Sequence, residues 1–286
     1  MGFVMNSAIR RMSYVVCLLS STAALLVMTT SAAAQVPGGF VESANSTAVR
    51  PLLTTTQIQA LLPPRGLFTF PAPYLTQGVR LTNATDCAGG ADCVNYVGYA
   101  YWRNINNHAG SDTMLIVLTL DRSHSGTGPN LYSYNKLTDV VTNLGPLFDA
   151  ATALSWASGE GWYFSATQPT KLYLNDGPRM RRYDVLSRQL DTVFDVSTNP
   201  ALFGTNRYIW QMSSSNDDSV HAATLADAST YAFLGCLVYR ESTKQFLYFP
   251  QVGSNFNECQ IDKSGRWLSI LERVFPTTSE LDLRDH

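Results

Sequence analysis

The sequence predicts an all-β protein, a β-propeller of four-stranded antiparallel blades with a short helix near the N-terminus. A hairpin pattern that occurs three times is the main observation behind this prediction. Charged residues make up only 15% of the chain, and 14 tyrosines stand among many short apolar stretches separated by polar turns. Helix-rich domains normally use more Glu and Lys, so this composition favours strands.

The repeated hairpin is an apolar strand that ends on a tyrosine, followed by a polar turn and a second strand. Its three copies are Leu131–Phe148 with Tyr134, Met180–Ser197 with Tyr183, and Cys236–Val252 with Tyr239. The differences between the tyrosine numbers are 49 and 56 residues. This spacing suits one four-stranded blade per repeat rather than a shorter solenoid coil.

An unbroken apolar run at Met114–Leu120 supports the same fold. A run of this length indicates a strand that is buried on both faces. Because propeller blades stack face to face, their middle strands are covered on both sides, and the propeller accounts for the run.

The N-terminus has the order of a secretory signal peptide over residues 1–34. Arg10 and Arg11 form a basic start, Tyr14–Met28 is apolar, and Ala32–Ala34 is a small-residue exit. The alternative is a membrane anchor, but the apolar run is short for a bilayer core, which needs about 20 residues. We therefore expect a secreted or periplasmic protein without a permanent membrane span.

Residues 35–65 are predicted to be a leader and a short helix. Thr54 and Gln57 have the spacing of a capping box, and the apolar residues Ile58, Leu61 and Leu62 follow at helical spacing. The apolar face of this helix is expected to cover one end of the body.

The blades are predicted within residues 66–272, with repeat units near 96–148, 150–197, 205–252 and 258–272, followed by an unpatterned tail at 273–286. This count gives about 3.5 to 4 blades, and known closed propellers generally have about four to eight. Either the strands at Gly66–Leu81 complete the last blade in a small ring, or the chain is an incomplete piece of a larger propeller.

Four cysteines follow the signal peptide, and an even number in an oxidising compartment indicates two disulfides. Three pairings are formally allowed. We prefer Cys87–Cys93 and Cys236–Cys259 because each closes a local loop. The alternative, a four-cysteine zinc site, lacks the Cys-x-x-Cys spacing.

Two blade segments resemble a known family. Tyr183-Asp184-Val185 before a turn, and Ser264–Leu268 entering a strand, are similar to the periplasmic TolB-type propeller superfamily, which includes the oligogalacturonate-lyase-like propellers. The resemblance covers roughly residues 96–271 and implies the fold. In the lyase-like relatives a histidine cluster with a glutamine holds a metal. This sequence has no His-x-His cluster, so metal and cofactor stay unassigned.

The candidate catalytic residues are Glu258, His221 and Asp218, which fall at or near strand starts in the repeat alignment. A carboxylate beside an imidazole supplies general acid and base chemistry or binds a metal. The alternative interpretation is structural: Asp218 caps a local turn and His221 is a satisfied strand residue.

The candidate ligand-binding residues are Asn107 and His108 in a polar loop, and Asn257 and Gln260 beside Glu258. Their amide and imidazole groups could hydrogen-bond a sugar, whereas the alternative for the loop is an ordinary solvated surface.

The net charge of −2 gives no reason to expect a nucleic-acid partner. The first functional hypothesis is an exported binding or scaffold module that contacts a glycan or an envelope protein. The second is a carbohydrate-active propeller, a lyase or hydrolase, with its site at the channel mouth. The third is a truncated fragment without independent function.

Overall fold

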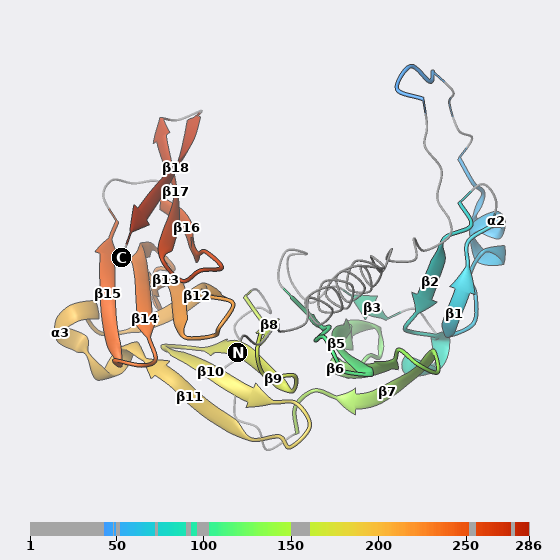
Figure 1. Ribbon diagram of the computed structural model, residues 1–286, viewed down its shortest axis with the longest axis horizontal. Coiled ribbons are helices and arrows are strands. Elements are labelled where there is room, and N and C mark those ends of the chain that lie inside the picture. The colour runs from blue at the N-terminus through green and yellow to red at the C-terminus, as the bar shows by residue number, and fades with distance from the viewer. Residues whose placement is uncertain are drawn as a thin grey trace, which may run out of the picture. The chain divides into compact units, whose positions relative to one another are not determined.

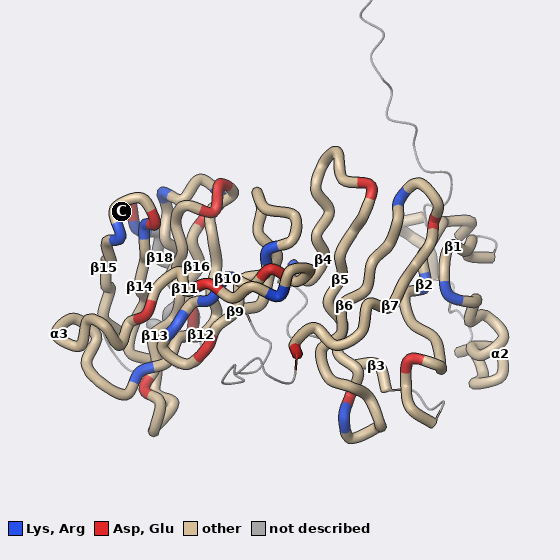
Figure 2. The backbone as a smooth tube through the Cα atoms, turned by 90° about the horizontal axis from the view of Figure 1, so that it is seen from below, with Lys and Arg blue, Asp and Glu red and all other residues tan. Residues whose placement is uncertain are grey.

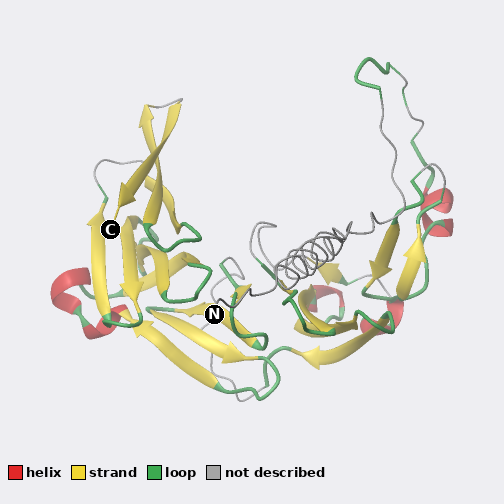
Figure 3. Cartoon of the chain, viewed as in Figure 1, coloured by secondary structure: helices red, strands yellow, loops and turns green. Residues whose placement is uncertain are grey.

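The computed structural model describes residues 43–47, 49, 52–71, 74–89, 93–95, 103–149, 161–251, 256–275 and 278–285. Strands make up most of this part of the chain, as Figure 3 shows, and the sheets are antiparallel. The predicted all-β class is confirmed. The predicted signal peptide and the segments 96–102 and 150–160 of the predicted repeat units lie outside the described residues.

The chain divides into two compact units, Met1–Arg50 with Thr69–Gly78, and Pro51–Phe68 with Val79–His286. Residues 43–47 of the first unit form a turn closed by the Ser46 amide, which donates to the Ser43 carbonyl at 2.9 Å. The second unit contains the blades and every candidate site residue.

The predicted N-terminal helix is present as α2, Thr55–Ala60. Its capping box is confirmed, since the Gln57 amide donates to Thr54 Oγ1 at 3.3 Å and the Thr54 amide donates to Gln57 Oε1 at 2.8 Å. The expected cover is wrong: Ile58, Leu61 and Leu62 are each at least half exposed. The pattern fixes which face is apolar, but packing decides whether that face is buried.

The remaining N-terminal elements are short. They are β1 (Gly66–Thr69), β2 (Gln77–Arg80) and the 3-10 turn η1 (Ala84–Asp86). β1 and β2 form a two-stranded sheet. Asp86 accepts hydrogen bonds from Arg65 and from Asn143 Nδ2, the latter at 2.9 Å, which ties η1 to strand β7 (Val140–Pro146) of the sheet that follows.

Four sheets then follow in chain order, and we name them blades 1 to 4 (Figure 1). Blade 1 contains β3 (Val94–Asn95), β4 (Ile105–Asn106), β5 (Thr113–Leu120), β6 (Gly128–Asn135) and β7 (Val140–Pro146), with η2 (Arg122–His124) between β5 and β6. Blade 2 contains β8 (Tyr163–Phe164), β9 (Lys171–Asp176), β10 (Arg179–Asp184) and β11 (Leu190–Asp195). Blade 3 contains β12 (Arg207–Ser214), β13 (Val220–Asp227), β14 (Phe233–Arg240) and β15 (Gln245–Pro250), preceded by η3 (Val196–Thr198) and α3 (Pro200–Phe203). Blade 4 contains β16 (Phe256–Ile261), β17 (Trp267–Phe275) and β18 (Thr278–Asp285).

The three repeated tyrosines occupy equivalent places. Tyr134, Tyr183 and Tyr239 are each the last but one residue of the third strand in the order of the sheet: β6, β10 and β14. Each hairpin then pairs with the next strand of the same sheet. The repeat predicted from the sequence is therefore one structural module used three times.

Apolar side chains between successive blades form the core. One cluster joins blades 1 and 2 around Tyr183, a second joins blades 2 and 3 around Tyr239, and a third joins blades 3 and 4. In β13, Val220 and Ala222 belong to the third cluster while Ala223 belongs to the second. The middle strand is thus buried on both faces, which is the property that the unbroken run at Met114–Leu120 predicted for β5.

The predicted unpatterned tail at 273–286 is wrong. Residues 278–285 form β18, which pairs with β17 in a hairpin, Leu271 opposite Leu281 and Ser269 opposite Leu283. The segment alternates apolar and polar residues only from Leu281, too briefly to stand out in the sequence. Hydrogen bonding to β17 stabilises this segment as a strand, although its sequence pattern is too weak to indicate one.

Both predicted disulfides are present, Cys87–Cys93 and Cys236–Cys259. The second joins β14 to β16 and therefore links blade 3 to blade 4. The cysteines are buried, with Cys236 and Cys259 both inside the third core cluster.

The stability of the blades is expected to fall in acid. Burial opposes ionisation of Asp184, but hydrogen bonds from Ser187, Thr170 and Leu186, with nearby Lys171, outweigh it and lower the pKa of Asp184 from 3.8 to about 2. Hydrogen bonds from Ser215 and Ser219 lower the pKa of Asp217 to about 2. A carboxyl group with a lowered folded-state pKa stabilises the fold above its unfolded pKa, and that contribution disappears as pH falls through the folded value.

Urea denaturation of the parent chain should therefore give a free energy of unfolding that is level above about pH 5 and declines between about pH 5 and pH 2. The Asp184→Asn variant, which removes one of these titrations, should show a shallower decline. A parent stability that is constant or rising as pH falls through this interval would contradict the prediction.

Candidate functional site

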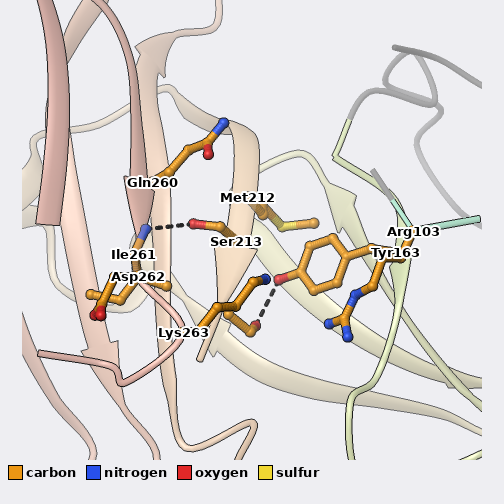
Figure 4. A pocket seen from close by; sticks show the side chains of 9 residues that line it. Arg103, Tyr163, Met212, Ser213, Gln260, Ile261, Asp262 and Lys263 are labelled. Atoms are coloured by element: carbon orange, nitrogen blue, oxygen red, sulfur yellow. Dashed lines mark hydrogen bonds between the residues drawn. The ribbon is translucent and has the colours of Figure 1, made fainter. Parts of the chain in front are cut away.

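The first candidate site is a pocket of about 320 Å³ at the inner strands of blades 2, 3 and 4, which we call the inner-strand pocket (Figure 4). It is lined by Arg103, Tyr163, Met212, Ser213, Ser214, Gln260, Ile261, Asp262 and Lys263. Tyr163 comes from β8, Met212 to Ser214 from β12, and Gln260 and Ile261 from β16.

A bulge shapes the β12 wall of this pocket. The register of β12 against β13 shifts between Trp210 and Ser213, and Gln211 within the bulge has φ of +46°. Gly161 lies against it with φ of +84°, and a Cβ at that position would be 2.9 Å from the Met212 amide nitrogen. Glycine is therefore required for blade 2 to approach blade 3 here.

Two cationic side chains line the pocket. Arg103 and Lys263 both line it, and neither side chain forms an ion pair or hydrogen bond with a described residue. Surrounding protein removes water from the Lys263 ammonium, and repulsion from Arg103 adds to this effect, so the pKa of Lys263 is lowered despite the opposing charge of Asp218. The two cations thus act on one another across a shared space.

The pocket lining also contains one acid, Asp262, whose carboxylate is held by its own turn. Both oxygens of Asp262 are used in its own turn, where they accept from the amides of Ser264, Arg266 and Trp267 at 2.9–3.1 Å. These bonds hold the pKa of Asp262 well below its ordinary value. Asp262 therefore stays ionised, and its negative charge partly offsets those of Arg103 and Lys263.

Several other basic residues of the blades have acidic partners. Arg179 pairs with Asp195 at 2.9 Å, Arg182 with Glu241 at 3.1 Å and Arg207 with Asp227 at 2.7 Å. Figure 2 shows the same interspersion of acidic and basic residues over blades 2 and 3. The run of arginines at 179–182 is thus largely neutralised, unlike Arg103 and Lys263.

A second pocket, of about 290 Å³, lies between β4 and β8, and we call it the Asn106 pocket. It is lined by Arg103, Ile105, Asn106, Asn107, His108, Ala109, Phe164, Ser165 and Ala166. Asn106 is 3% exposed, and its Oδ1 has no hydrogen-bond partner among the described residues. A buried acceptor without a donor is costly, so a ligand that donates a hydrogen bond would stabilise it.

The predicted ligand-binding residues Asn107 and His108 line this second pocket. His108 Nε2 lies 3.1 Å from the Ser165 carbonyl oxygen, and Lys136 Nζ donates to Asn107 Oδ1 at 3.4 Å. Gln260 lines the inner-strand pocket, and the side chain of Asn257 lies outside the described residues. The predicted ligand set is therefore divided between two pockets that share Arg103.

The candidate catalytic residue His221 is completely buried on β13. Its Nδ1 lies 2.5 Å from Ser214 Oγ, and its Nε2 lies 2.9 Å from Glu241 Oε1. Ser214 Oγ in turn lies 2.7 Å from the Tyr163 hydroxyl oxygen, the contact drawn from Tyr163 in Figure 4. The carboxylate that contacts His221 is thus Glu241.

Asp218 has a different neighbourhood. It lies in the turn between β12 and β13, is 5% exposed, and accepts hydrogen bonds from the loop after β8. The donors are Ser165 Oγ at 2.7 Å, the Ala166 amide at 3.2 Å, and the Thr167 amide and hydroxyl at 2.8 and 2.7 Å. Asp218 therefore ties blade 3 to blade 2. The cap of the local turn is its neighbour Asp217, which accepts from the Ser219 amide at 3.1 Å.

Glu258 lies on β16 opposite Leu271 of β17 and is partly buried. The three predicted catalytic residues thus lie on three separate segments, the β12–β13 turn, β13 and β16. Any catalytic role for them stays a prediction.

Sequence reasoning missed Ser214, Glu241, Arg103 and Lys263. Ser214 and Glu241 lie seven residues before and 20 residues after His221, spacings that match no known motif. Their proximity follows from strand pairing, since β13 places His221 opposite both Ser214 and Tyr239. The one available signal would have been the prediction that β12, β13 and β14 are neighbouring strands, which would have brought these residues together.

No group of three or more His, Cys, Asp or Glu side chains suited to a metal ion occurs among the described residues. In the same part of the chain, no helix is long and apolar enough to span a bilayer.

Comparison with known proteins gives fold neighbours only. No protein-family profile and no curated protein sequence matches the chain. An oligogalacturonate lyase in complex with manganese aligns with 13% identity and a TM-score of 0.50, covering 77% of this chain and 61% of the lyase. The oligogalacturonate lyase of Vibrio parahaemolyticus aligns with 9% identity and a TM-score of 0.50, covering 77% of this chain and 60% of the lyase. TolB of Acinetobacter baumannii aligns with 12% identity and a TM-score of 0.38, over 68% of this chain and 41% of TolB.

The chain therefore spans about 60% of the length of the two lyases that it matches. At such low identity the similarity concerns architecture and not activity. Together with the blades and their repeated hairpin, it shows that this chain has the β-propeller fold of the oligogalacturonate lyases.

Proposed function

We propose that the chain is an exported β-propeller module that binds an anionic glycan in the inner-strand pocket. The observation that carries the proposal is the pair of cations, Arg103 and Lys263, which line one pocket and form no ion pair with a described residue. Carboxylates are bound strongly by such groups because the hydrogen bonds are charge-assisted and Arg can bind both oxygens.

Sugar units next to the charged one would occupy the Asn106 pocket. Both pockets contain Arg103, so one extended ligand can reach both. The hydroxyl groups of a sugar are donors for the unpaired Asn106 Oδ1, and His108 and Asn107 line the same pocket. An oligosaccharide with at least one acidic unit is the ligand class that satisfies both pockets.

Export is part of the proposal. It rests on the signal-peptide pattern of residues 1–34, and the two disulfides are compatible with an oxidising compartment. An envelope protein that presents carboxylates would be an alternative partner for the same cations.

Calorimetric titration of residues 35–286 with a galacturonate trimer tests the proposal. This probe is chosen because two fold neighbours are named for oligogalacturonate. We expect binding of the acidic trimer, much weaker binding of its methyl-esterified form, and a loss of affinity with salt. Arg103→Ala and Lys263→Ala should each weaken binding by roughly 10- to 100-fold, because a hydrogen bond to a charged group contributes about 1.5–3 kcal/mol.

Arg179→Ala is the matched control, since Arg179 is paired with Asp195 on β10 and lines neither pocket. Its affinity should equal that of the parent. Equal binding of the acidic and esterified trimers, or unchanged affinity in the Arg103→Ala and Lys263→Ala variants, would refute the proposed site.

A further inference from the structure

The row of hydrogen bonds that leads from the inner-strand pocket through Ser214 to His221 and Glu241 is not explained by glycan binding. Ser214 and His221 face each other across β12 and β13. Glu241 follows β14, two residues beyond Tyr239, the residue paired with His221. Strand pairing therefore aligns a hydroxyl, an imidazole and a carboxylate, with heavy-atom distances of 2.5 and 2.9 Å between consecutive members.

Each hydrogen bond in this row can be assigned a donor and an acceptor. Hydrogen bonding from His221 is the largest cause that lowers the pKa of Glu241, so Glu241 is ionised near neutral pH. An ionised carboxylate only accepts hydrogen bonds, so His221 carries its proton on Nε2 and presents Nδ1 as an acceptor. Ser214 then donates its hydroxyl proton to Nδ1. This is the order of a serine nucleophile, its general base and the acid that orients the base.

The outer end of the row is fixed in place. Arg182 Nη1 of blade 2 lies 3.1 and 3.3 Å from the two Glu241 oxygens. The Tyr173 ring lies against the His221 ring, with 5.2 Å between their centroids. The imidazole is thus held by Glu241 and by the Tyr173 ring, and rotation away from Ser214 would break its bond to Glu241.

The inner end of the row reaches the pocket. Ser214 is among the residues that line it, beside Tyr163, whose hydroxyl oxygen is 2.7 Å from Ser214 Oγ. A carbonyl carbon bound to Ser214 would place its oxygen near donors, with the Tyr163 hydroxyl and the Lys263 ammonium both lining the same space (Figure 4). Donors at this place stabilise the negative charge of a tetrahedral intermediate.

We propose that Ser214 is the nucleophile of an ester hydrolase whose substrates are carboxylic esters bound in the inner-strand pocket. Ser214 Oγ bonds to the ester carbonyl carbon while His221 Nδ1 takes its proton. The tetrahedral adduct expels the alcohol, whose oxygen receives that proton from His221, and leaves an acyl-serine. Water then attacks the acyl carbon, gives its proton to His221, and the acid departs as Ser214 recovers the proton. Glu241 is a positioning residue that acts through His221.

The proposal extends beyond the binding of a glycan and does not depend on it. A small activated ester tests the hydrolysis without any sugar, so a negative result here leaves the titration with galacturonate trimer unaffected. Conversely, if the chain hydrolysed esters but did not bind the acidic trimer, only the proposal of glycan binding would be refuted.

The first experiment treats the folded chain, residues 35–286, with a fluorophosphonate probe and identifies the labelled residue by peptide mass spectrometry. We expect one label per chain, on Ser214. The unaltered chain is the sample, so the result does not depend on a variant that folds. Cooperative thermal unfolding shows that the sample is folded. If such a sample takes no label, or is labelled at another serine, the proposal is wrong.

The second experiment follows hydrolysis of p-nitrophenyl acetate. Ser214→Ala and His221→Gln should each lower kcat/KM by at least about 10³-fold. Ser187→Ala is the control, because Ser187 is an exposed serine in the turn between β10 and β11 and lines neither pocket. Its rate should stay near that of the parent. Equal rates for the parent and Ser214→Ala would contradict the assignment.

The positioning role of Glu241 has its own readout. Glu241→Gln should lower kcat with little change in KM and shift the pH at which the rate rises, because the imidazole loses its charged partner. Glu241→Asp, which keeps the charge, should restore part of the rate. If Glu241 had only a structural role, both variants would change the melting temperature and leave the pH profile of the rate unchanged.

Discussion

Replacement of Asp218 by Ala is expected to lower the free energy of unfolding by about 3–5 kcal/mol, the range for breaking a buried charged network. The carboxylate accepts from Ser165, from the Ala166 amide and from both donors of Thr167. Each bond to a charged group contributes about 1.5–3 kcal/mol, and the donors left behind are partly shielded from water. Urea denaturation, followed by tyrosine and tryptophan fluorescence, measures the loss.

Two further variants test whether the hydrogen bonds of Asp218 between blades 2 and 3 cause this loss of stability. Asp218→Asn keeps one acceptor oxygen and should fall between the parent and Asp218→Ala. Asp217→Ala is the adjacent control, and it should cost much less because Asp217 is exposed and bonds only within its own turn. Equal losses at positions 217 and 218 would show that Asp218 is not the tie between blades 2 and 3.

Replacement of Tyr183 by Ala is expected to cost a similar amount, about 3–5 kcal/mol, because it removes a large buried ring. Tyr183 is 0% exposed, packs against Phe148 with 5.2 Å between ring centroids, and donates to the Leu147 carbonyl at 3.0 Å. It thereby joins blade 2 to the end of blade 1. Tyr183→Phe should lose only the hydrogen bond, about 1 kcal/mol.

Tyr134 is the matched control in the equivalent position of blade 1. It is only partly buried, and its hydroxyl donates to Asp139 of its own hairpin at 2.5 Å. Tyr134→Ala should therefore destabilise the chain less than Tyr183→Ala in the same urea experiment. If the two variants lost equal stability, the tyrosines would support their own hairpins rather than the contact between blades.

The tyrosine repeat shows why the fold could be predicted. A strand, its closing turn and the next strand are adjacent in sequence, so local patterning contains them. Asn135 and Asp184 follow their tyrosines and accept from turn amides in the same way. What the pattern does not contain is burial: Tyr183 packs between blades, whereas Tyr134 is partly exposed. Packing between modules depends on which sheet lies opposite.

The candidate site shows the opposite balance. His221 stood out as a histidine next to acidic residues, yet the acid that contacts it is Glu241, which follows a different strand. The sequence placed Asp218 beside His221, but its carboxylate bonds residues 165–167 of another blade. Asp218 lies in the turn before β13 and His221 lies on β13, so nearness in sequence does not bring their side chains together.

The residues alone were enough to predict the all-β class, the three copies of the hairpin, the capping box of α2 and the preferred disulfide pairing. Each of these depends on residues close in the chain or on a repeated period. Only the tertiary structure decided that Ser214, His221 and Glu241 form one row, that Arg103 and Lys263 share a pocket, and that residues 278–285 complete a hairpin with β17. The reason is physical: strand pairing and the stacking of blades bring distant residues together, and no local pattern records which partners they will meet.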